Sequence, residues 1–170
     1  MNVEWGEHAE FQLTDDGRGR IFVEQGSDWW QTRYQIAHEV FHGFFTRPQR
    51  FHWTHEMFAV EAALAAMRRI GEDDYVASVE WRLTGEAESL PLERMLTTPI
   101  GPSQYPEGLY GRAFVTGRAL IDAIGWRSLK GLVHTVDAAG QPSVAAWLST
   151  LDVPERRAAV EVLGRDSGLI

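Results

Sequence analysis

The stretch YQIAHEVFH, residues 34–42, contains the pattern H-E-x-x-H, and the rest of the sequence can be interpreted outward from it. On a helix, residues four apart lie on the same face, so the imidazoles of His38 and His42 can bind a single zinc ion. Glu39 lies about 100° further round such a helix and can lean toward the open side of the metal, where it can take a proton from a bound water. The stretch therefore predicts two metal ligands and a general base.

The residues around this motif predict an amphipathic helix. Asp28 is expected to cap its N-terminus, with Gln31 as the partner in a capping box. Apolar residues then recur at helical spacing as far as Phe45, and Gly43 and Pro48 are expected to end the helix. Each histidine follows a residue of the apolar stripe by one position, which places both at the edge of the buried face.

Composition limits the class of protein. The 170 residues are enough for one domain with a sizeable core, and 44% hydrophobic and 24% charged residues are ordinary globular values. No cysteine is present, so any zinc must be held by histidine and carboxylate ligands. The net charge of -8 argues against nucleic acid as a partner. Because the first residues are neither basic nor apolar and no stretch has the length of a membrane span, we expect a soluble, cytoplasmic protein with no membrane partner.

The hydrophobic pattern predicts an α+β fold that is mostly helical, with a small N-terminal sheet. Residues 9–13 and 20–24 alternate apolar with polar side chains around a turn, which is typical of a β-hairpin and is the only clear strand signal. A second helix is expected from a cap at Thr54 to about Ile70. A third is expected over residues 72–83.

The C-terminal half is expected to begin with an irregular region at residues 84–104 and to continue as a helical subdomain. Its four helical segments are predicted at 109–124, where Gly125 ends the helix, and at 126–134, 143–151 and 154–163. We expect a single domain over residues 1–170, in which residues 1–71 carry the hairpin and the zinc helices and residues 72–170 are mainly helical.

A zinc ion held by two histidines of one helix needs a third protein ligand and keeps its fourth position for water. The residues that follow the motif offer four candidates, namely His52, His55, Glu56 and Glu61. Glu61 interrupts an otherwise apolar run over residues 57–67. A carboxylate buried there is costly unless it meets a cation, a histidine or a metal.

The segment WTHEMFA, residues 53–59, resembles the W-x-x-E-G-x-A segment of gluzincin metallopeptidases, a class that includes aminopeptidases. In that class it places a zinc-binding glutamate on the helix after H-E-x-x-H, so the resemblance makes Glu56 the third ligand. Met57 replaces the usual glycine, and the connection from His42 is shorter than in the aminopeptidases. Glu61 has the aminopeptidase spacing without the motif, and it lies about 140° round the helix from Glu56. It is then a candidate for orienting a ligand imidazole.

The segment YGRAFV, residues 110–115, resembles a Y-G-x-A-F-x helix that follows the zinc helices in many gluzincin-like domains. Gluzincins use a tyrosine or histidine of a later helix to donate a hydrogen bond to the oxyanion of the tetrahedral intermediate. The resemblance gives this role to Tyr110, with Tyr105 as the alternative. A tyrosine that packs its ring in the core and reaches solvent with its hydroxyl is an equally good interpretation of either residue.

Taken with the motif, the resemblance implies a zincin-like domain that acts as a zinc-dependent peptidase on peptide or protein substrates. The two motif histidines and Glu56 would hold Zn²⁺, and Glu39 would be the general base. The small sheet would bind an extended peptide at its edge. The runner-up is a catalytically inactive zincin-like protein that binds or regulates a partner, with a structural metal or none. A helical protein with a chance motif is a third interpretation.

Overall fold

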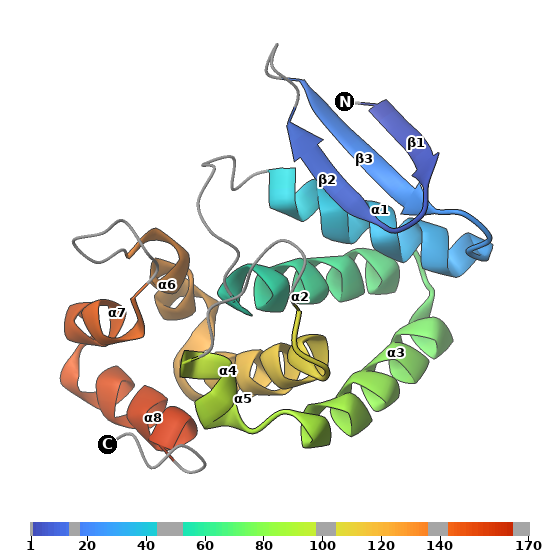
Figure 1. Ribbon diagram of the computed structural model, residues 1–170. Helices are drawn as coiled ribbons and strands as arrows, with labels where there is room; N and C mark the ends of the chain where they lie inside the picture. Colours follow the sequence, from blue (N-terminus) through green and yellow to red (C-terminus); the bar gives the residue numbers. More distant parts are fainter. Residues whose placement is uncertain (1, 14–17, 44–52, 98–104, 136–142, 165–170) are drawn as a thin grey trace. The chain divides into compact units, whose positions relative to one another are not determined.

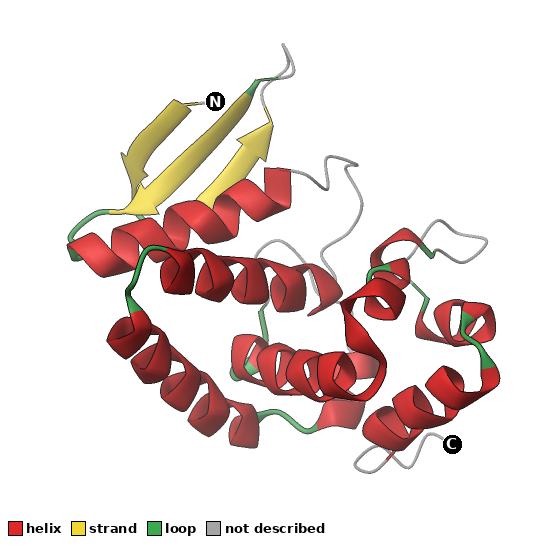
Figure 2. Cartoon of the chain, turned by 180° about the vertical axis from the view of Figure 1, so that it is seen from behind, coloured by secondary structure: helices red, strands yellow, loops and turns green. Residues whose placement is uncertain are grey.

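The computed structural model describes residues 2–13, 18–43, 53–97, 105–135 and 143–164, and these are mostly helical with a small sheet (Figures 1 and 2). The strands are β1 (Asn2–Gly6), β2 (Glu10–Leu13) and β3 (Gly19–Glu24). The helices are α1 (Trp29–Gly43), α2 (Trp53–Arg69), α3 (Asp73–Glu86), α4 (Leu92–Thr97), α5 (Leu109–Leu129), α6 (Gly131–His134), α7 (Val144–Thr150) and α8 (Val153–Gly164), and a 3-10 turn, η1 (Ala87–Ser89), precedes α4. The mostly helical α+β class predicted from the sequence is therefore confirmed.

Two compact units make up the chain. One comprises Met1–Pro48 and Phe58–Glu80, and the other comprises Gln49–Met57 and Trp81–Ile170. The buried apolar residues of the first unit include Ile21, Val23, Val60, Ala63, Leu64, Met67, Val76 and Val79. Those of the second unit include Trp53, Met57, Leu83, Leu90, Met95, Leu109, Ala113, Leu120, Leu129 and Trp147. Both α2 and α3 continue unbroken through the division.

The sheet has the order β1-β3-β2, with β3 in the centre. β2 pairs antiparallel with β3, as the hairpin prediction requires, and residues 14–17 of the connecting turn lie outside the described part. β1 pairs parallel with β3, so that Val3 lies opposite Ile21 and Trp5 opposite Val23. This strand was not predicted, because its apolar and polar residues alternate over only five positions.

Helix α1 packs across β2 and β3, as Figure 1 shows. The cap prediction is confirmed, since the backbone N–H of Gln31 donates to Oδ1 of Asp28 over 2.7 Å. The capping-box prediction is wrong. The Gln31 side chain donates instead to Glu24 at the end of β3, over 3.2 Å, and Gln35 donates to the same carboxylate. These bonds attach the first turns of α1 to the sheet.

Helix α2 begins at Trp53, so Thr54 lies in its first turn and is not the cap that the sequence predicted. The helix is buried on most of its circumference, as expected from the apolar run, and Gly71, with φ of 84°, follows its end. The ring of Phe58 stacks on that of Phe41 in α1, with centroids 6.2 Å apart. This contact joins α2 to α1 within the first unit.

The predicted irregular region is largely helical where it is described. α3 extends to Glu86, and η1 and α4 follow it, while residues 98–104 lie outside the described part. α4 buries Leu92 and Met95, a spacing of three residues that one short turn of helix is enough to satisfy. Gly125 has non-helical dihedral angles (φ 74°, ψ 163°), so the helical stretch that begins at Leu109 is broken there, as the sequence predicted. The predicted helix at 126–134 follows as the last part of α5, to Leu129, and as α6.

In the second unit, α5 approaches the end of α3 closely at Gly111. A Cβ added to this glycine would lie 2.6 Å from the amide nitrogen of Ala87 and still closer to the carbonyl oxygen of Leu83. Beside it, the guanidinium of Arg112 donates to the carbonyl oxygens of Leu90 and Ala87, each over 2.7 Å. The absence of a side chain at position 111 is therefore a condition for this packing.

We expect Gly111→Ala to lower the free energy of unfolding by about 3 kcal/mol, because the atoms that meet the new methyl group are backbone atoms that cannot rotate away. Gly85→Ala is the matched control. It changes a glycine of α3 around which there is open space, so the better helix propensity of alanine should raise stability by up to about 1 kcal/mol. Urea denaturation of both variants tests this, and equal stabilities would contradict the close packing at Gly111.

Candidate metal centre

Helix α1 brings the two histidines of the H-E-x-x-H motif together. Their Nε2 atoms lie 3.1 Å apart, and the ring centroids are separated by 4.8 Å with an interplanar angle of 74°. Two ligand nitrogens on one tetrahedral zinc ion, each at about 2.0–2.1 Å from the metal, lie about 3.3 Å apart. His38 and His42 are therefore spaced as ligands of one ion would be.

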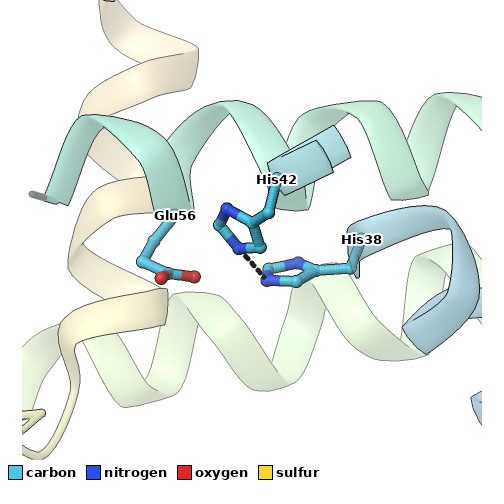
Figure 3. Close-up of side chains that lie close together, drawn as sticks. All are labelled: His38, His42 and Glu56. Carbon is cyan, nitrogen blue, oxygen red and sulfur yellow. Dashed lines mark hydrogen bonds between the residues drawn. The ribbon is translucent and has the colours of Figure 1, made fainter. Parts of the chain in front are cut away.

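Glu56, in the first turn of α2, supplies a carboxylate to the same group. One ring nitrogen of each histidine and one carboxylate oxygen of Glu56 lie within 4.8 Å of one another. Figure 3 shows the three side chains pointing toward one another, two from α1 and one from α2.

The donor set fits a metal ion. Two imidazole nitrogens and one carboxylate oxygen form a set that zinc accepts, with a fourth position left open for water. Ligand atoms of one tetrahedral zinc ion lie about 3.3 Å apart, so the group, whose atoms lie within 4.8 Å of one another, has to close by up to about 1.5 Å around an ion. His38 is 7% exposed and Glu56 3% exposed, and His42 is partly exposed. The chain thus contains a His-His-Glu group that could hold a metal ion.

Two other carboxylates near the motif are buried like Glu56. Glu39 follows His38 on α1 and is 6% exposed, so a proton acceptor is buried next to a candidate ligand. Glu61 is 4% exposed on α2, but it does not belong to the group that could hold a metal among the described residues. Of these two glutamates of α2, Glu56 and not Glu61 is a member of the described group that could hold a metal ion.

The histidines considered as alternative ligands are placed differently. His55 lies on α2 next to Glu56, is partly exposed and is not a member of the described His-His-Glu group. His52 lies outside the described residues.

Of the two tyrosines proposed from the sequence, Tyr105 contacts Glu56 and Tyr110 contacts Tyr105. The hydroxyl of Tyr105 donates to Oε1 of Glu56 over 3.2 Å. The ring of Tyr110, at the start of α5, stacks on that of Tyr105 with centroids 5.8 Å apart and an interplanar angle of 15°. Tyr110 is 38% exposed. The sequence indicated both tyrosines but not the bond to Glu56, which joins residues 49 positions apart.

The chain was compared with protein-family models, curated proteins and solved structures. None of the three comparisons finds a match. Within the described part of the chain, no helix combines the length and the apolar character needed to cross a membrane. The function has to be inferred from the chemistry of the residues.

The first turns of α1 are held by contacts that the sequence did not reveal. The indole N–H of Trp30 donates to Glu72 over 2.7 Å, and the guanidinium of Arg33 forms an ion pair with the same carboxylate at 3.1 Å. Further along α1, the ring of Tyr34 lies 6.1 Å from that of His38, measured between centroids. These contacts fix the helix that carries the two histidines.

Proposed function

We propose that this protein is a zinc-dependent peptidase of the gluzincin type, and that its helices and small sheet form a zincin-like domain. The observation that supports this best is the His38, His42 and Glu56 group, because its donor atoms are those of a catalytic zinc site with three protein ligands. The H-E-x-x-H motif adds Glu39 as a buried proton acceptor beside the ligands. Peptides or proteins would be the substrates.

The proposed reaction is hydrolysis of a peptide bond. Zinc bound to this group would lower the pKa of a coordinated water toward about 7 and polarise the scissile carbonyl. Glu39 accepts a proton from the attacking water as the oxygen–carbon bond forms. It then gives that proton to the departing amine as the carbon–nitrogen bond breaks, so the carboxylate returns to its starting state.

Tyr110 is proposed to donate a hydrogen bond to the oxyanion of the tetrahedral intermediate. Its partial exposure and its stacking on Tyr105, which itself contacts Glu56, support this role. The burial of Glu39 and Glu56 supports the mechanism in a second way. Charges interact more strongly where water is excluded, so a proton acceptor and a ligand placed there have a larger effect than they would have on the surface.

We expect the full chain, purified without added metal or chelator, to contain about one equivalent of zinc and to cleave peptides in a mixed peptide library. Removing the metal with a chelator should abolish cleavage, and adding zinc back should restore it. Magnesium should not restore it, because that ion prefers oxygen ligands and octahedral geometry. Elemental analysis and mass spectrometry of the digested library measure the two quantities.

Two results would argue against the proposal. Cleavage that survives complete removal of the metal would show that the activity does not depend on this group. One equivalent of zinc without any cleavage would favour the alternative of a binding or regulatory protein with a structural metal.

A further inference from the structure

We propose that Tyr105 is a positioning residue that holds the carboxylate of Glu56 in place for the metal, and so sets the affinity of the site for zinc. The proposal rests on one part of the proposed function, which is zinc binding by the His-His-Glu group. It does not depend on whether the protein hydrolyses peptides.

The hydrogen bond from Tyr105 restrains a flexible ligand. Its hydroxyl lies 3.2 Å from Oε1 of Glu56, and it is the donor because a carboxylate can only accept. A glutamate side chain loses considerable rotamer freedom when it is fixed. An ion that must fix the side chain on binding is therefore held less tightly than one that meets a carboxylate already in place. A donor on one carboxylate oxygen fixes the rotation of the group and still allows the second oxygen to bind an ion.

Tyr105 can act in this way because its own position is fixed by the second unit. Its ring stacks on that of Tyr110. Directly after Tyr105, the amide N–H of Leu109 donates to the carbonyl oxygen of Pro106 over 3.1 Å. Both tyrosines thus flank a short hydrogen-bonded turn at the start of α5, and the phenol is presented by structured backbone.

At Gly108 the backbone of this turn comes close to the end of α3 and to η1. Its φ is 79°, which disfavours any residue with a side chain. A Cβ at this position would also lie 2.7 Å from the carbonyl oxygen of Glu86 and still closer to the hydroxyl of Ser89. The turn that carries Tyr105 therefore packs against the end of α3 and η1 within the second unit, to which Glu56 also belongs. The donor and the acceptor of the hydrogen bond are held by one compact body.

This role differs from the oxyanion role that the sequence suggested as an alternative for Tyr105. A donor to the oxyanion affects turnover and leaves the resting metal site unchanged. A donor to a ligand affects the affinity for the metal, typically by about 10- to 100-fold when it is removed. Zinc affinity therefore separates the two roles, and it is measured without a substrate.

The experiment compares the metal-free full chain with its Tyr105→Phe variant in a zinc titration against a chromophoric chelator. We expect the variant to bind zinc about 10- to 100-fold more weakly, with an unchanged circular dichroism spectrum, because phenylalanine keeps the stacking on Tyr110. Tyr75→Phe is the matched control. It removes the same oxygen from a tyrosine whose ring lies against Tyr34, 6.3 Å between centroids, and it should bind zinc as the parent does.

A second pair of variants tests whether the effect passes through Glu56. In a chain that carries Glu56→Ala, adding Tyr105→Phe should change zinc affinity by less than about twofold, because the hydrogen-bond partner is already gone. Visible absorption of the cobalt-substituted protein adds a spectroscopic test. The Tyr105→Phe spectrum should differ from that of the parent, whereas a tyrosine that only supports the fold would leave the cobalt bands unchanged.

The outcomes separate this inference from the proposed function. Equal zinc affinity in the parent and Tyr105→Phe would overturn the positioning role while the metal site stands. The same weakening with and without Glu56 would show that Tyr105 acts by another route, and would also overturn it. No zinc binding by the parent would overturn both the inference and the proposed function. A weakened Tyr105→Phe variant of a protein that cleaves no peptide would support the inference and contradict the peptidase.

Discussion

The Glu39→Gln variant is expected to bind about one equivalent of zinc, as the parent does, and to cleave peptides about 10²- to 10⁴-fold more slowly. Glutamine has nearly the shape of glutamate, so a substitution at this buried position of α1 should leave the fold and the two neighbouring histidines in place. Its amide cannot accept a proton from water, and the proposed reaction therefore loses the group that moves the proton to the leaving amine. A loss of turnover at constant metal content is the signature of a general base.

The measurement is kcat/KM on one peptide chosen from the library, with zinc content determined on the same samples. Glu88→Gln makes the same chemical change at an exposed position of η1 and should cleave at the parent rate. A Glu39→Gln protein that cleaves as fast as the parent would refute the assignment of Glu39. A variant that loses its zinc would show that Glu39 supports the metal site and would leave the base unassigned.

Local sequence patterns predicted the parts of the fold that depend on local spacing. The helical period between Trp30 and Phe41 identified α1, and the four-residue spacing of His38 and His42 was enough to place both imidazoles on one face. The hairpin of β2 and β3 followed in the same way from strict alternation of apolar and polar side chains. In each case the residues that determine the structure are near neighbours in the chain.

Features that depend on distant contacts were not predictable. β1 pairs with β3 and not with β2, its neighbour in sequence, and Val3 and Trp5 alone are too short a pattern to indicate a strand. The same limit applies to the metal centre. Whether Tyr105 contacts the substrate or Glu56 depends on how a turn packs against η1, and no local pattern encodes that packing.

Glu56→Gln is expected to weaken zinc binding by more than about 100-fold, which exceeds the effect of removing a partner that acts only through a ligand. Glu61→Gln is the matched control, because it makes the same change at a second buried glutamate of the same helix. Glu61 is not a member of the His-His-Glu group, so its substitution should weaken zinc binding by at most about tenfold, the lower end of the effect of a residue that orients a ligand.

The two variants decide whether the third ligand is the glutamate favoured by the sequence motif or the one favoured by the distance from His42. The W-x-x-E-x-x-A segment favours Glu56, whereas the distance from His42 known in aminopeptidases favours Glu61. Five residues on a helix turn a side chain by about 140°, so the two carboxylates cannot replace each other at one metal. Zinc affinity lost in Glu61→Gln and kept in Glu56→Gln would assign the ligand to Glu61 and remove the basis of the Tyr105 proposal. The reverse result would mean that Glu56, in the first turn of α2, supplies the third ligand.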